Sequence, residues 1–194
     1  MRILLVLWLG CALSTPAWPH TGTGLSGGFA AGFAHPFQGM DHLLAMVSVG
    51  LWGAFLGRPL LYVLPMIFPT MMAAGAVLGM FVVPMPPIEL GIALSVMVLG
   101  GAIAFAFEAP TWLASAIVAI FAVFHGYAHG KELPSAADPV GFSAGFVLAS
   151  GLLHVSGIGT GLLSSMPHGV VTIRAVGAAI AVVGTWFLFR AVSP

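Results

Sequence analysis

Two histidines and an aspartate interrupt a long apolar stretch near the start of the sequence. They belong to the segment HPFQGMDH, residues 35–42, as His35, Asp41 and His42. A charged or strongly polar side chain at membrane depth costs roughly 2.5 kcal/mol or more, so it usually faces a bundle interior, a partner or a water-filled path. Imidazole and carboxylate groups are suitable ligands for borderline divalent cations such as Ni²⁺, Zn²⁺ and Co²⁺. The segment therefore indicates cation chemistry inside an apolar protein.

A second group of the same residue types lies about ninety positions further along the chain. His125 and His129 are four residues apart, and Glu132 follows three residues later. On a continuous helix this spacing places all three on one stripe, where they can act as metal ligands together. The alternative is structural: the histidines mark the membrane interface at a helix end, and Glu132 pairs with the adjacent Lys131.

Spacing limits what the first group can do alone. His42 follows His35 by seven residues, which is two turns and about 10 Å along a continuous helix, so both cannot bind one ion directly. Either the backbone is broken near Gly39, or His35 is an outer position and Asp41 with His42 a deeper one. Met46, one turn after His42, adds a thioether to the same stripe, although packing is the commoner role of methionine.

Three further residues are candidates. Glu89 follows a proline cluster and begins an apolar helix, so it is either a ligand or a carboxylate that complements the helix dipole. His20 lies near the expected start of the mature chain, but Pro19 lacks the amide hydrogen that chelation by an amino-terminal backbone would release. His154 sits deep in a predicted span, as a structural residue or as an exit-side ligand.

The elements that position these residues must be membrane helices. Of the 194 residues, 60% are hydrophobic and 5% are charged, and the mean hydropathy is +1.12. A chain of this composition cannot present an ordinary solvated surface, and it is predicted to be an integral membrane protein. Five basic residues balance five acidic ones, so the sequence offers no basic face and nucleic-acid binding is excluded.

Residues 1–17 have the parts of a secretory signal peptide: a basic start, a short apolar run and small residues before Ala17. We expect cleavage near Ala17, with residues 18–194 forming a single transmembrane helical domain; an uncleaved anchor is the alternative. In both cases residue 20 lies outside the cytoplasmic membrane, which fixes the orientation of the chain. The single cysteine, Cys11, belongs to the signal segment, so cysteine pairing carries no information.

The apolar runs predict an all-α polytopic bundle of about six transmembrane helices. Proline disfavours helix in the residue before it and is tolerated in the first turn, so we expect the first span to begin after a break at His35-Pro36. The glycine-rich segment from Gly22 to Ala34 is predicted to be outer, interfacial or partly re-entrant. The expected spans are residues 36–56, 60–83, 88–107, 111–129, 140–163 and 175–189.

This topology brings the candidate residues to one depth. With six spans and an outside start, the ionisable residues fall on the outer half of the membrane although they are scattered over more than a hundred positions. They are His20, His35, Asp41, His42, Glu89, His125, His129 and Glu132. The convergence predicts one site built from several helices.

The motifs also resemble a known family. HPxxGxDH at residues 35–42, continued by Ala45-Met46 and by Val49-Gly50-x-Trp52, resembles the signature of the HupE/UreJ proteins, which are associated with hydrogenase and urease gene clusters. HGxAHGxE at residues 125–132 and LHxxG at residues 153–157 resemble two further motifs. Ser150 departs from the threonine that members often carry.

The resemblance implies nickel or cobalt permeation across the bacterial inner membrane, in support of metalloenzyme assembly by metallochaperones or hydrogenase and urease maturation proteins. It implies functional roles for His35, Asp41, His42, His129 and Glu132. Phe68 and Glu89 match further positions that the family keeps.

Competing interpretations remain open at this point. No G-x-x-x-x-G-K-[ST] element is present, so ATP-driven transport by this chain alone is not predicted. A non-transporting accessory protein that binds a metal in the membrane is one alternative to a permease. An intramembrane metal-dependent hydrolase is a remote one, because His125 is not followed by the glutamate that H-E-x-x-H enzymes use as general base. The expectation is therefore a transporter and not an enzyme.

Overall fold

The computed structural model describes residues 25–132 and 138–193, and this part of the chain is helical, with no β-strand. The signal-peptide prediction, His20 and Cys11 lie outside the described residues. The helices are α2 (Leu25–Gln38), α3 (Met40–Leu56), α4 (Leu60–Met80), α5 (Ile88–Ala104), α6 (Thr111–Glu132), α7 (Pro139–Gly161) and α8 (Gly169–Val192), with a short 3₁₀ helix η2 (Leu162–Ser165) between the last two.

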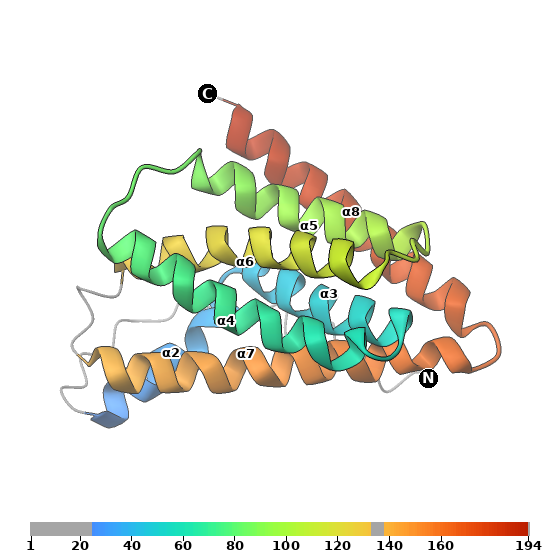
Figure 1. Ribbon diagram of the computed structural model, residues 1–194, viewed down its shortest axis with the longest axis horizontal. Coiled ribbons are helices and arrows are strands. Elements are labelled where there is room, and N and C mark those ends of the chain that lie inside the picture. The colour runs from blue at the N-terminus through green and yellow to red at the C-terminus, as the bar shows by residue number, and fades with distance from the viewer. Residues whose placement is uncertain (1–24, 133–137, 194) are drawn as a thin grey trace.

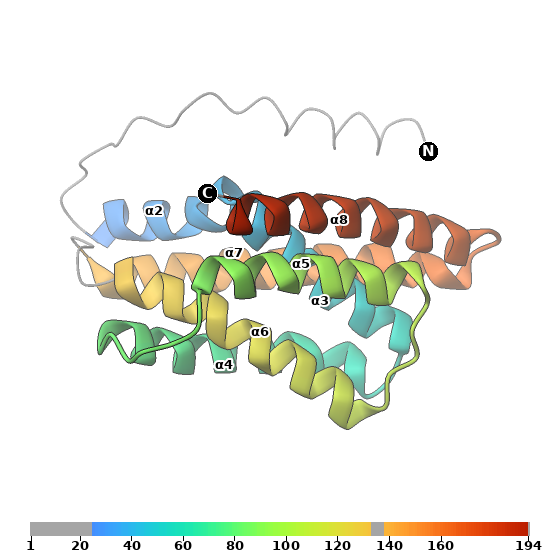
Figure 2. The ribbon, with the colours of Figure 1, turned by 90° about the horizontal axis from the view of Figure 1, so that it is seen from above.

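The helices lie side by side and alternate in direction (Figures 1 and 2). We call the end where α2 and α7 begin the α2 end, and the opposite end, where α3 finishes, the α3 end. Helices α4, α6 and α8 run from the α3 end to the α2 end, whereas α5 and α7 run the other way. Helix α2 is followed by α3, whose axis is turned by 82°, and both helices pack against α7.

Three groups of helices pack especially closely: α4 with α6, α5 with α8, and α7 with both α2 and α3. Glycines make these contacts possible, because a Cβ atom at each of them would meet backbone atoms of the facing helix. The glycines are Gly75, Gly79, Gly126 and Gly130 between α4 and α6, Gly100, Gly177 and Gly184 between α5 and α8, and Gly32, Gly50, Gly145 and Gly157 around α7.

Four of the described helices are long and apolar enough to cross a membrane, namely α4, α6, α7 continued by η2, and α8. The bent pair of α2 and α3 passes the same test when taken as one span, which makes five. Helix α5 is apolar but has only 17 residues. The chain is thus a multi-pass membrane protein by length and composition, and the count of six spans stays a prediction.

The break before the first full helix lies at Gly39, so the prediction of a break at His35-Pro36 is wrong by a few residues. Helix α2 continues through Pro36 to Gln38, and α3 begins at Met40 with its axis turned by 82°. Gly39 has the extended backbone angles φ −99° and ψ 112°. The segment that we expected to be outer, interfacial or partly re-entrant is helical from Leu25 onward and packs along α7, and its position relative to the membrane stays a prediction.

The last helix also differs from its predicted bounds. We expected it to begin at Ala175, after the charged Arg174, but α8 begins at Gly169. Arg174 is exposed, and its Nε–H donates a hydrogen bond of 2.8 Å to the carbonyl of Ala104 at the end of α5. The charge therefore satisfies a helix-end carbonyl without interrupting α8.

Candidate metal-binding site

Four imidazole rings meet in the bundle beside the break between α2 and α3. His35 comes from α2, His42 from the first turn of α3, and His125 and His129 from α6. The 82° bend at Gly39 shortens the distance between the first two, so that the ring centroids of His35 and His42 are 6.5 Å apart. On a straight helix seven residues span about 10 Å along the axis. The bend is therefore what allows α2 and α3 to contribute to one site.

The rings from α3 and α6 are closer still. The centroid of His42 lies 4.9 Å from that of His125 and 4.6 Å from that of His129, and His35 lies 5.0 Å from His129. With metal–nitrogen bonds of about 2.1 Å, two imidazoles on one ion have centroids about 5 Å apart. In this conformation, no group of three His, Cys, Asp or Glu side chains within residues 28–131 and 138–193 could hold a metal ion together.

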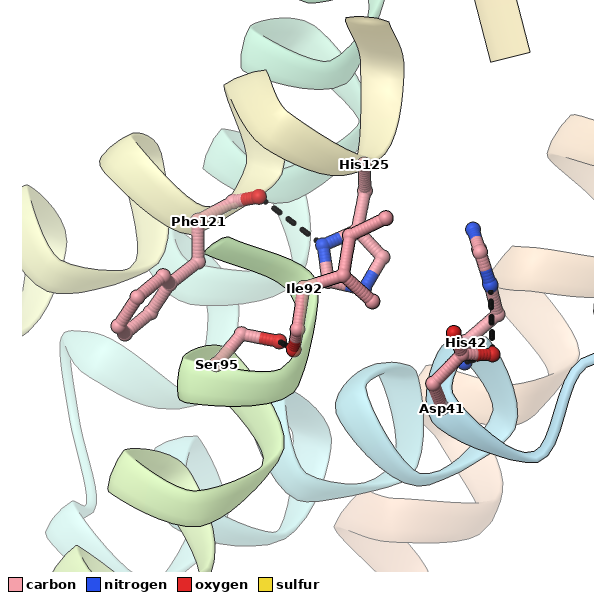
Figure 3. Close-up of polar contacts among 6 residues, drawn as sticks. All are labelled: Asp41, His42, Ile92, Ser95, Phe121 and His125. Carbon is pink, nitrogen blue, oxygen red and sulfur yellow. Dashed lines mark hydrogen bonds and ion pairs between the residues drawn. The ribbon is translucent and has the colours of Figure 1, made fainter. Parts of the chain in front are cut away.

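Hydrogen bonds orient two of the rings (Figure 3). Nδ1 of His42 lies 2.9 Å from Oδ1 of Asp41, and Nδ1 of His125 lies 3.0 Å from the carbonyl oxygen of Phe121. Nδ1–H must be the donor to the carbonyl, and a carboxylate favours the same tautomer, so Nε2 keeps its lone pair in both rings. Neither Nε2 has a hydrogen-bond partner among the described residues. A carboxylate or carbonyl on one ring nitrogen, with the other nitrogen free, is the arrangement of metal-binding histidines.

Aromatic side chains that the sequence analysis did not identify line the cluster. The ring of Phe146 in α7 lies 4.5 Å from His129 and 6.0 Å from His35, and Phe142 lies 5.4 Å from His35. His125 is 0% exposed and His129 is 8% exposed. The four-residue spacing of Phe142 and Phe146 is the signal that could have placed them on the interior stripe of α7.

The other candidates are placed as follows. Asp41, whose side chain is 28% exposed, contacts His42, so in this conformation it orients a ring; its role as a direct ligand stays a prediction. Met46 and Phe68 are fully buried in the core, and His154 is 3% exposed. Glu89 is exposed in the first turn of α5. Glu132 ends α6, but its side chain lies outside the described part of the structure.

A multi-pass bundle of apolar helices with four histidines gathered in its interior defines a membrane protein with a candidate cation site. The chain belongs to the HupE/UreJ family, because the family's sequence profile, described as HupE / UreJ protein, matches residues 7–187. The resemblance seen in the sequence is thereby confirmed. The chain is also similar to the protein HupE of Rhizobium leguminosarum bv. viciae, with 43% identity over 178 residues that cover 91% of this chain and 93% of that protein. No solved structure matches the chain.

Proposed function

We propose that this protein is a secondary, ATP-independent uptake system for a divalent transition metal, with Ni²⁺ as the main substrate. The imported metal supplies hydrogenase or urease maturation. One observation carries the proposal: imidazoles from three helices meet inside an apolar bundle, and Nε2 of His42 and of His125 is left without a partner among the described residues. A buried polar atom without a partner costs about 1 to 3 kcal/mol. A bound cation would use these lone pairs.

The site acts by replacing water around the ion. Imidazole nitrogens take over part of the hydration shell of the cation, and Asp41 holds His42 so that its Nε2 faces the ion. Because no three ligands are poised together among the described side chains, water, a rotated side chain or a residue outside the described part completes the coordination. Such incomplete ligation suits a transported ion, which has to leave as well as bind.

The membrane potential supplies the driving force. In the proposed orientation the α2 end faces the periplasm, and the cation moves inward across the bacterial inner membrane. A divalent cation then gains about 4.6 kcal/mol per 100 mV of inside-negative potential. This energy is enough for accumulation without nucleotide hydrolysis. Because protonated imidazole has no free lone pair, uptake falls as the outer medium is acidified.

The test is uptake of radioactive nickel by cells that lack other importers. Uptake should collapse in His35→Ala, Asp41→Ala and His129→Ala variants while the amount of membrane-inserted protein is unchanged. His168→Ala serves as the matched control, because His168 is an exposed histidine at the start of α8. Uptake at the wild-type rate in all three cluster variants would contradict the proposal.

A further inference from the structure

A further buried histidine, His154 of α7, lies beyond the four-histidine cluster. The ring of Phe68 contacts both the cluster and His154, with its centroid 5.6 Å from that of His125 and 5.4 Å from that of His154. Phe68 is 0% exposed and His154 is 3% exposed. Nε2 of His154 has no hydrogen-bond partner among the described residues. Packing alone does not explain a buried imidazole at this position, because an apolar side chain would avoid the unsatisfied nitrogen.

The register of α7 shows that His154 is deeper than the cluster. It follows Phe146, which contacts the ring of His129, by eight residues or about 12 Å along the helix. Ser150 lies between them on the same stripe, and its hydroxyl donates a 2.8 Å hydrogen bond to the carbonyl of Phe146. The interior face of α7 therefore carries polar groups past the cluster toward the α3 end.

Resting on the transport function above, we propose that His154 is an inner binding position for the divalent cation, reached from the cluster past the ring of Phe68. A single imidazole leaves the cation with most of its water shell, so the position binds weakly. Weak binding at several positions in series is what permits an ion to leave as well as to enter. Phe68 is fully buried and contacts both His125 and His154, so it connects the two positions.

The first test detects the cation at position 154 directly. In a Cys11→Ser background, His154→Cys places a thiolate there, and added Co²⁺ should produce a thiolate-to-cobalt absorption band in the purified protein. Val155→Cys is the matched control, since Val155 is the next residue and is 63% exposed. A band in the first variant alone supports the proposal. No band, or equal bands in both variants, overturns it.

The second test separates the inner position from the cluster. We expect His154→Phe to lower nickel flux into proteoliposomes by about tenfold or more, while equilibrium nickel affinity at the cluster changes by less than about twofold. His154→Cys should retain more flux than His154→Phe, because a thiolate also binds the ion. Wild-type flux in His154→Phe overturns the inner position; His154→Leu replaces this variant if it does not fold. If the unmodified protein moves no nickel, the transport function fails, and the cobalt band alone decides whether position 154 binds a cation.

Discussion

The interior of the bundle differs in kind between its two ends. On the side of the α2 end, α6 buries His125 and His129, and α3 presents His42. Toward the α3 end the same helices bury apolar side chains, such as Val118 of α6 and Leu51 of α3, both 0% exposed. Helices α3 and α6 therefore change from polar to apolar along their length, whereas α7 carries the buried His154 further toward the α3 end. Imidazole rings thus gather in one half of the interior, whereas apolar side chains fill most of the other half.

The apolar half is held by packing and by hydrogen bonds near the α3 end, among them those of Arg174 and Trp52. Leu64 of α4, Leu99 of α5 and Ile173 of α8 belong to the same fully buried cluster as Val118. Nε1–H of Trp52 donates a hydrogen bond of 3.2 Å to the carbonyl of Phe107, between α5 and α6. For a transported cation this half must open, whereas the histidine half only has to exchange ligands. Four substitutions test this division, in order of expected effect.

The largest effect is expected from Gly126→Val, because Gly126 lies beside His125 in the close contact between α6 and α4. A Cβ atom there would meet the backbone of Met72, including its Cα at 2.8 Å. Overpacking of this kind costs roughly 1 to 3 kcal/mol, so the variant should lose thermal stability and nickel binding together. Thermal unfolding in detergent measures the loss. Gly151→Val is the control, since nothing lies within 4 Å of its Cβ position; equal stability of the two variants would contradict the packing argument.

The second effect concerns the orientation of His42. Asp41→Asn removes the carboxylate that accepts from Nδ1, and loss of such a partner typically lowers metal affinity by about 10- to 100-fold. Isothermal titration with Ni²⁺ on the purified protein measures this change. Glu108→Gln, which neutralises an exposed carboxylate between α5 and α6, should leave the affinity unchanged. An unaltered affinity in Asp41→Asn would show that the aspartate does not position the ring.

A smaller effect is expected at the bend itself. The backbone angles of Gly39 are open to any residue, but a Cβ atom there would lie 2.8 Å from Oδ1 of Asp41 and 3.0 Å from Nδ1 of His42. Gly39→Ala should therefore crowd the Asp41–His42 pair and lower nickel affinity, by less than Asp41→Asn does. The same titration measures it. Gly101→Ala is the control, because no described atom lies within 4 Å of the Cβ position of Gly101. Identical nickel affinities in the two alanine variants would show that the bend does not position the Asp41–His42 pair.

The smallest effect belongs to the apolar half. Trp52→Phe deletes the hydrogen bond to Phe107 while keeping an aromatic ring, and a bond of this kind contributes about 0.5 to 1.5 kcal/mol. We expect a modest fall in unfolding temperature with unchanged nickel affinity, measured on one preparation. A fall in affinity as large as that of Asp41→Asn would mean that the two halves are not separable.

Much of this arrangement can be predicted from the sequence, because polar side chains in an apolar membrane protein usually face the bundle interior, a partner or a water-filled path. The spacing of His125 and His129 put both on one helix face, and the structure has them there on α6. The position of the helix break, at Gly39 and not at His35, shows what the sequence could not predict. A straight helix was one of two alternatives, and in the structure the helix continues through Pro36, breaks at Gly39 and packs against α7, a tertiary contact that the sequence pattern does not contain.

The sequence does not predict which side chains of other helices each polar group contacts. The contact of His129 with Phe146 joins two different helices, α6 and α7, and the contacts of Phe68 with His125 and with His154 involve three helices. Such contacts depend on the rotation of each helix about its axis. A uniformly apolar helix gives little indication of that rotation, because lipid and protein interior accept the same side chains.

The central claim is that the histidine half binds a divalent cation that the bundle then moves. Its most direct test is nickel flux into proteoliposomes with and without an imposed inside-negative potential, compared with equilibrium nickel binding by the same protein. The account predicts saturable flux that rises with the potential and is lost, together with binding, in a His42→Ala/His129→Ala variant. Nickel binding without any flux would contradict transport and identify a membrane metal-binding protein instead.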